Sequence, residues 1–97
     1  MKKAILDTSF ILTCVKQKID FFDDMEKAGI QILIPKQVIV ELKGVDKSGL
    51  ALRILEKNKY EEVDLGTKYV DAGIAEYANK HPEIFVATLD KELKKKV

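Results

Sequence analysis

The chain has few residues that could cross-link it, bind zinc or anchor it in a membrane. Its 97 residues include one cysteine, one histidine and no tryptophan. Cys14 cannot form an intramolecular disulfide, and no spacing of cysteine and histidine resembles a zinc site. No apolar run approaches the roughly 20 residues that span a bilayer, and the apolar run after Lys3 is too short for a signal peptide. We expect a soluble, cytoplasmic protein without membrane contacts, in which Cys14 is a buried apolar residue.

Charged residues are abundant but balanced. The 17 basic and 16 acidic residues leave a formal charge of +1, and 46% of the residues are hydrophobic. This balance argues against binding nucleic acid through overall charge alone, although it leaves a local basic patch open. The length and the apolar content predict a single domain over residues 1–97 with a hydrophobic core of its own.

Short apolar runs alternate with helical patterns along the chain. The apolar runs predict strands at residues 4–6, 30–34, 63–65 and 84–89. Apolar residues at helical spacing predict helices at about residues 10–15, 19–28, 36–44, 48–58, 66–81 and 91–97. This alternation is typical of βαβ units, whose parallel sheet is covered on both faces. We therefore predict the α/β class, a three-layer α/β/α sandwich with a central parallel sheet of four strands.

Four acidic residues come soon after the predicted strands. Asp7 and Asp90 directly follow the first and fourth strands, whereas Glu41 and Asp71 lie in the helices after the second and third. In right-handed βαβ crossovers, the strand ends that lead into helices lie along one edge of the sheet. The other acids fall on polar helix faces or in loops, where a solvated charge is expected. The sequence therefore predicts that these four carboxylates gather at one edge.

Such a cluster needs a counter-charge, because neighbouring carboxylates repel one another. Oxygen ligands in this number suit Mg²⁺ or Mn²⁺, which keep several water ligands and pair with phosphate oxygens. A bound divalent ion can activate water and neutralise charge on a phosphodiester. Thr8, Ser9 and Thr88 add hydroxyls close to Asp7 and Asp90, where they can hold a ligand water or orient a carboxylate.

Each acidic position also has a purely structural interpretation. Asp7 and Asp90 could cap helices, Asp71 could favour a helix dipole, and Glu41 could be a solvated helical residue. Each alternative is credible for one residue taken alone. The shared placement of all four favours the functional interpretation.

A lysine-rich segment follows Asp90 in the sequence. Lys91, Lys94 and Lys95 could contact the phosphate backbone of a substrate near the acidic edge. A run of lysines near a terminus is also typical of a solvated helix end, so both interpretations stay open.

The motifs around the four acids resemble those of the PIN-domain family of nucleases. The resemblance covers nearly the whole chain and rests on Leu6-Asp7-Thr8-Ser9, the lone Glu41, Val70-Asp71-Ala72-Gly73-Ile74 and Ala87-Thr88-Leu89-Asp90. The sequence around these motifs is similar to that of archaeal members related to ribosomal-RNA processing endonucleases, and also to that of VapC-type toxins. The resemblance implies a metal-dependent endoribonuclease, with Asp7, Glu41, Asp71 and Asp90 as ligands of Mg²⁺ or Mn²⁺. It also implies RNA as substrate and allows a homodimer, an antitoxin or a ribosome-assembly partner.

Two departures from the family pattern affect these expectations. Many relatives have a second acid where Ala72 stands, and relatives usually continue into a fifth short strand, whereas this chain stops at Val97. We therefore expect the sheet to lack that edge strand. The main alternative function is a catalytically silent PIN-like scaffold that binds RNA or protein.

Overall fold

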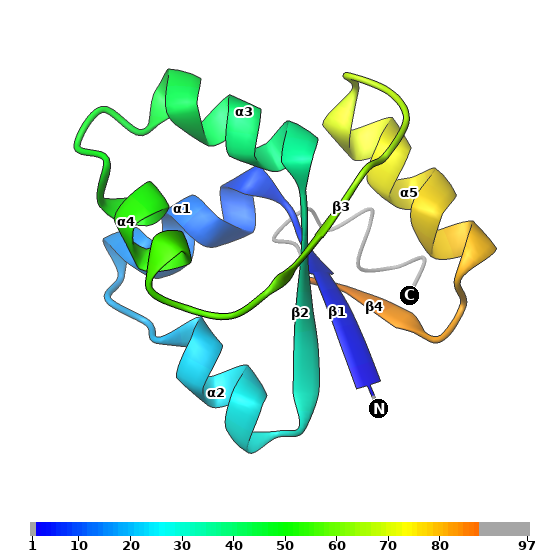
Figure 1. The fold of residues 1–97 in the computed structure, drawn as a ribbon, viewed down its shortest axis with the longest axis horizontal. Helices are drawn as coiled ribbons and strands as arrows, with labels where there is room; N and C mark the ends of the chain where they lie inside the picture. The colour runs from blue at the N-terminus through cyan, green and yellow to red at the C-terminus, as the bar shows by residue number, and fades with distance from the viewer. Residues whose placement is uncertain (1, 88–97) are drawn as a thin grey trace.

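The computed structural model describes residues 2–87 and consists there of alternating strands and helices (Figure 1). The strands are β1 (Lys2–Leu6), β2 (Ile30–Pro35), β3 (Glu61–Val63) and β4 (Ile84–Ala87). The helices are α1 (Thr8–Lys16), α2 (Phe21–Lys27), α3 (Lys36–Val45), α4 (Leu50–Glu56) and α5 (Val70–Lys80). The predicted helix at residues 91–97 lies outside the described part, as do the last two residues of the predicted fourth strand.

The four described strands form one parallel sheet in the order β3-β2-β1-β4. Ala4 in the central strand pairs with Ile32 of β2 on one side and with Phe85 of β4 on the other. Figure 1 shows α5 on one face of this sheet and the other four helices on the opposite face. The predicted three-layer α/β sandwich with a parallel sheet of four strands is therefore confirmed.

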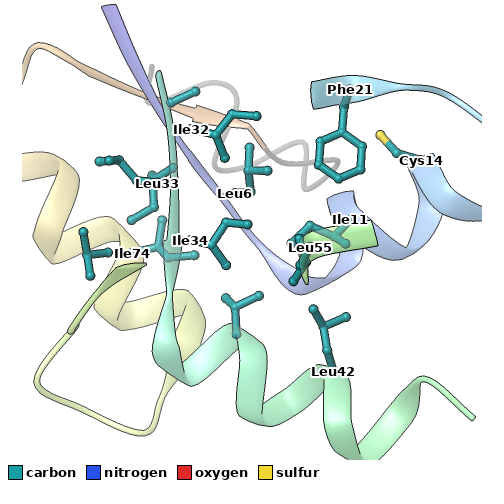
Figure 2. Packing of buried hydrophobic residues seen from close by; sticks show 14 of the residues in the cluster. Leu6, Ile11, Cys14, Phe21, Ile32, Leu33, Ile34, Leu42, Leu55 and Ile74 are labelled. Atoms are coloured by element: carbon teal, nitrogen blue, oxygen red, sulfur yellow. The ribbon is translucent and has the colours of Figure 1, made fainter. Parts of the chain in front are cut away.

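The core lies on both faces of the two central strands. Ile32 and Ile34 point toward α1 and α4, while Leu33 between them points toward Ile74 of α5 (Figure 2). All of these side chains are buried, with Ile34 and Ile74 at 0% exposure. Because both faces are covered, β2 is apolar without alternation from Ile32 to Pro35, as expected for a strand inside a parallel sheet.

The predicted position of the third strand is wrong by two residues. β3 ends at Val63, and α5 begins only at Val70 instead of near Gly66. The carboxylate of Asp64 accepts a hydrogen bond from the Gly66 N–H at 2.8 Å, and Gly66 has a left-handed φ of 75°. This local turn competes with both strand and helix, so residues 64–69 form a loop.

Two helix boundaries also differ from the prediction. α3 passes through Gly44 and ends at Val45, because a glycine in a helix costs only about 1 kcal/mol and does not by itself stop it. α2 begins at Phe21 because Asp20 caps it, accepting the Asp23 N–H at 3.0 Å. Ile19, the first residue of the predicted helix, therefore precedes α2 and is 43% exposed.

Two side chains that precede α4 cap its first turn. The helix begins at Leu50, after Gly49 in a left-handed conformation, and Ser48 accepts the Leu50 N–H at 3.2 Å. The carboxylate of Asp46 accepts the Ala51 N–H at 2.9 Å and so satisfies another free donor of the first turn. Ser48 thus contributes to the cap together with Asp46.

Cys14 is buried in the core, as predicted, with 6% of its surface exposed. Burial raises the pKa of its thiol, and the nearby charge of Asp24 acts in the same direction. The thiol therefore stays protonated and packs as a small apolar group. Between residues 2 and 87, no helix has both the length and the apolar character needed to cross a membrane.

Candidate active site

Asp7 lies at the carboxyl end of the central strand, where β1 leads into α1. Its side chain is 4% exposed, and its Oδ1 accepts the Phe10 N–H at 2.7 Å as the N-cap of α1. Its own N–H donates to the carbonyl of Ala87 in β4 at 3.4 Å. Its role as an N-cap does not exclude a second role for this residue.

Glu41 is held from the neighbouring helix by a hydroxyl. Thr8 Oγ1 donates to Glu41 Oε1 at 2.5 Å and so joins the first turn of α1 to α3. Thr8 is 9% exposed, whereas Glu41 is exposed to solvent. Its neighbour Leu42 is fully buried and anchors this part of α3 in the core. The hydrogen bond limits the rotamers of an otherwise mobile carboxylate.

Asp71 enters the same region from the opposite layer. It lies in the first turn of α5, next to Val70, which is 6% exposed. Its carboxylate is exposed to solvent, near the positive end of the helix dipole, where a negative charge is favoured.

These residues line one small pocket at the carboxyl edge of the sheet. The pocket has a volume of about 150 Å³, and its lining consists of Asp7, Thr8, Ser9, Glu41, Val70 and Asp71. Residues more than 60 positions apart in sequence thus meet in one site, as the strand order requires. Of the other predicted site residues, Thr88, Asp90, Lys91, Lys94 and Lys95 lie outside the described part of the chain.

A larger cavity of about 300 Å³ lies between α1, α2 and α4. Its lining is mainly apolar, including Val15, Phe21 and Ile54, and Asp20 is its only carboxylate among the described residues. The smaller pocket has the convergent polar groups that chemistry on a charged substrate requires, so we place the candidate site there.

The donor set of the small pocket fits a hydrated divalent cation. Carboxylates and hydroxyls supply only oxygen atoms, the ligands that Mg²⁺ and Mn²⁺ prefer. Within residues 2–87, no three acidic, histidine or cysteine side chains are close enough to hold one ion directly. A volume of about 150 Å³ has room for several waters at about 30 Å³ each, and Mg²⁺ usually keeps several of its own.

The loop that leads to Asp71 is fastened to the start of α3. Gln37 Nε2 donates to Asp64 Oδ1 at 2.7 Å, and Gln37 Oε1 accepts the Leu65 N–H at 3.2 Å. The ammonium of Lys36 lies 3.1 Å from Asp64 Oδ2. The helices that carry Glu41 and Asp71 are therefore joined close to the pocket. Sequence reasoning missed these contacts, since nothing in the local pattern of either segment indicates its partner.

The carboxyl group of Asp64 is expected to titrate at about 2, below its ordinary value of 3.8. The Gly66 N–H has the largest effect on this pKa, followed by Gln37 and Lys36. The folded-state pKa is lowered, so its contribution to stability is complete above about pH 4 and is lost as the pH falls toward 2. Carbon-detected NMR titration measures this pKa, and Gln37→Ala should raise it. A midpoint near 3.8 in the wild type would contradict the described loop.

The fold and the pocket together define a three-layer α/β protein with an acidic site at the carboxyl edge of its parallel sheet. Residues 4–97 match the model of a family described as a PIN like domain. The chain therefore belongs to the PIN-domain nuclease family, and the predicted family resemblance is confirmed.

Relatives and a solved structure support this assignment. Ribonuclease VapC4 of Methanocaldococcus jannaschii is 35% identical over 109 aligned residues, which cover 100% of this chain and 83% of that protein. The rRNA-processing protein fcf1 of Schizosaccharomyces pombe is 32% identical, with coverage of 97% of this chain and 52% of that protein. The structure of the PIN domain endonuclease Utp24 superposes with a TM-score of 0.81 and 34% identity, covering 96% of this chain and 74% of that one.

Proposed function

We propose that this protein is a divalent-metal-dependent endoribonuclease that hydrolyses RNA phosphodiester bonds. The observation that carries the proposal is the pocket in which Asp7, Glu41 and Asp71 meet at the carboxyl edge of the sheet. Membership of a nuclease family gives this acidic pocket a chemical purpose, because relatives are named as a ribonuclease and an endonuclease. A silent scaffold would have no need to gather these carboxylates.

The pocket residues have distinct proposed tasks. Asp7, Glu41 and Asp71 would hold Mg²⁺ or Mn²⁺ in part through its water ligands. Asp90 is proposed as the fourth ligand. When bound, the ion lowers the pKa of a water and neutralises charge on the phosphodiester. Thr8 keeps the Glu41 carboxylate directed at the pocket through its hydrogen bond.

The other side chains act on ligand water and on the substrate strand. The hydroxyl of Ser9 lies in the pocket lining, where it can hold a ligand water, and Thr88 is proposed to do the same beside Asp90. Lys91, Lys94 and Lys95 are proposed to contact the phosphate backbone on the way to the pocket.

The biological role that we propose is RNA cleavage in ribosomal-RNA processing or as a VapC-type toxin. The names of fcf1 and VapC4 represent these two roles among the relatives. A ribosome-assembly factor would be the partner in the first case and an antitoxin in the second, and either form could act as a homodimer.

The test is cleavage of an end-labelled RNA with unpaired loops by the full chain. We expect cleavage with Mg²⁺ or Mn²⁺, products with 5′-phosphate and 3′-hydroxyl ends, and complete loss in EDTA that excess metal reverses. Equal cleavage with and without chelator would exclude the proposed mechanism. RNA binding without cleavage in either metal would instead favour the scaffold.

A further inference from the structure

Tyr69 is an exposed aromatic residue beside the carboxylate pocket. Its side chain is 65% exposed, more than any other aromatic side chain in the described part of the chain. It directly precedes Val70 and stands two residues before Asp71, both of which line the pocket. Its Cα is therefore within about 7 Å of the Cα of Asp71 along the chain. A ring this exposed adds little to the core and is free to contact a ligand.

The backbone that presents this ring is well fixed. The Tyr69 N–H donates to Thr67 Oγ1 at 3.3 Å, and its carbonyl accepts the Gly73 N–H at 2.8 Å. A Cβ on Gly73 would lie 2.9 Å from Thr67 Cγ2 and 3.0 Å from the side chain of Leu65, so the loop packs closely on α5. The loop is also tied to α3 through Gln37. The backbone of Tyr69 is thus fixed directly before two residues of the pocket lining, which lowers the entropy lost on binding.

The positively charged side chain of Lys68 lies near the Tyr69 ring. The ammonium of Lys68 lies 5.5 Å from the centroid of the Tyr69 ring, within the range of a cation–π interaction. An aromatic face beside a positive charge suits one nucleotide of a single strand, whose base can stack while its phosphate meets the ammonium. The charge of Lys68 is complementary to phosphate and opposite to that of the pocket carboxylates.

We propose that Tyr69 stacks on an unpaired base of the RNA strand next to the phosphate at the pocket, with Lys68 contacting that strand's backbone. This inference rests on the proposed function and deepens it, since it assigns contact with the unpaired base to Tyr69 and contact with the backbone to Lys68. Bases in a duplex are already stacked on both faces and cannot be received by the ring. Tyr69 is then a specificity-determining residue that selects unpaired regions.

The first test measures binding of a short single-stranded RNA containing 2-aminopurine in an Asp7→Asn background, where Mg²⁺ can be present. Removal of one stacking platform is expected to weaken binding by about 5- to 150-fold for Tyr69→Ala. Tyr69→Phe keeps the ring and should retain both the affinity and the quenching of 2-aminopurine. Lys68→Gln should weaken binding less and lower the salt dependence by about one phosphate contact. Because the ring is exposed, thermal unfolding should be unchanged in all three variants.

Equal affinity and quenching for Tyr69→Ala and the Tyr69 parent would overturn the stacking proposal, as would a loss with Tyr69→Phe as large as with Tyr69→Ala. Affinity for a fully paired RNA serves as the control and should not depend on Tyr69. A second measurement uses the otherwise wild-type chain, where Tyr69→Ala should raise KM for a looped RNA with little change in kcat. Stacking without any cleavage would support this inference while contradicting the proposed function. Cleavage with the same KM in Tyr69→Ala as in the wild type would support the proposed function and contradict this inference.

Discussion

Asp7→Asn is expected to abolish RNA cleavage while leaving the fold intact. Asparagine has nearly the same shape and is as good an N-cap as aspartate, so it can still accept the Phe10 N–H. It removes the negative charge that we assign to metal binding. Loss of residues that merely support metal ligands costs about 10- to 100-fold, so loss of a ligand should exceed about 100-fold. Cleavage rates and calorimetric Mn²⁺ titrations measure the effect.

The chain offers a matched control for this substitution. Asp20 caps α2 through the Asp23 N–H, as Asp7 caps α1, but it does not line the small pocket. Asp20→Asn makes the same chemical change at another helix N-cap, an exposed one, and should leave metal binding and cleavage near wild-type levels. If Asp7→Asn cleaves as fast as Asp20→Asn, Asp7 serves only as a helix cap.

Leu42→Ala should give one of the largest losses of stability in this chain. Its side chain is fully buried in the core cluster, and truncation of such a leucine typically lowers the free energy of unfolding by about 2–5 kcal/mol. For a domain whose total stability is about 5–15 kcal/mol, that is a large share. Urea unfolding followed by circular dichroism measures the change.

Val40 is the control on the same helix. It lies on the other side of Glu41 in sequence and is 67% exposed, so Val40→Ala should change the free energy of unfolding by less than about 0.5 kcal/mol. The two variants flank one candidate ligand and thereby separate an effect on the fold of α3 from an effect on Glu41. Similar losses for both variants would contradict the described burial.

The central strands were predictable because burial on both faces leaves a continuous apolar sequence. Ala4-Ile5-Leu6 of β1 and Ile32-Leu33-Ile34 of β2 read as strands for this reason and belong to neighbouring strands of the sheet. β3 has only three residues, of which Glu61 and Glu62 are exposed and Val63 alone is buried. An edge strand that pairs with β2 alone in the described sheet leaves no comparable pattern, and the apolar Leu65 shifted the prediction toward the loop.

The part of the candidate site that depends on the strand order of the sheet was predictable from the sequence. A parallel sheet brings its carboxyl ends to one edge, so Asp7, Glu41 and Asp71 could be assigned to one region. The hydrogen bond between Thr8 and Glu41 depends on how α1 packs on α3, and no local sequence pattern contains that information. The proposed role of Tyr69 in base stacking was missed because it depends on the exposure of the side chain next to the pocket residues, which the sequence does not show.

The hydrogen bond between the Asp7 N–H and the Ala87 carbonyl affects when the site can form during synthesis. β1 precedes β4 in the chain but needs it as its second neighbour in the described sheet. On the ribosome, a nascent chain that has not yet released residue 87 cannot complete the backbone around its first carboxylate. The backbone around Asp7 is therefore complete only after the 80 residues that follow Asp7 up to Ala87 have been made.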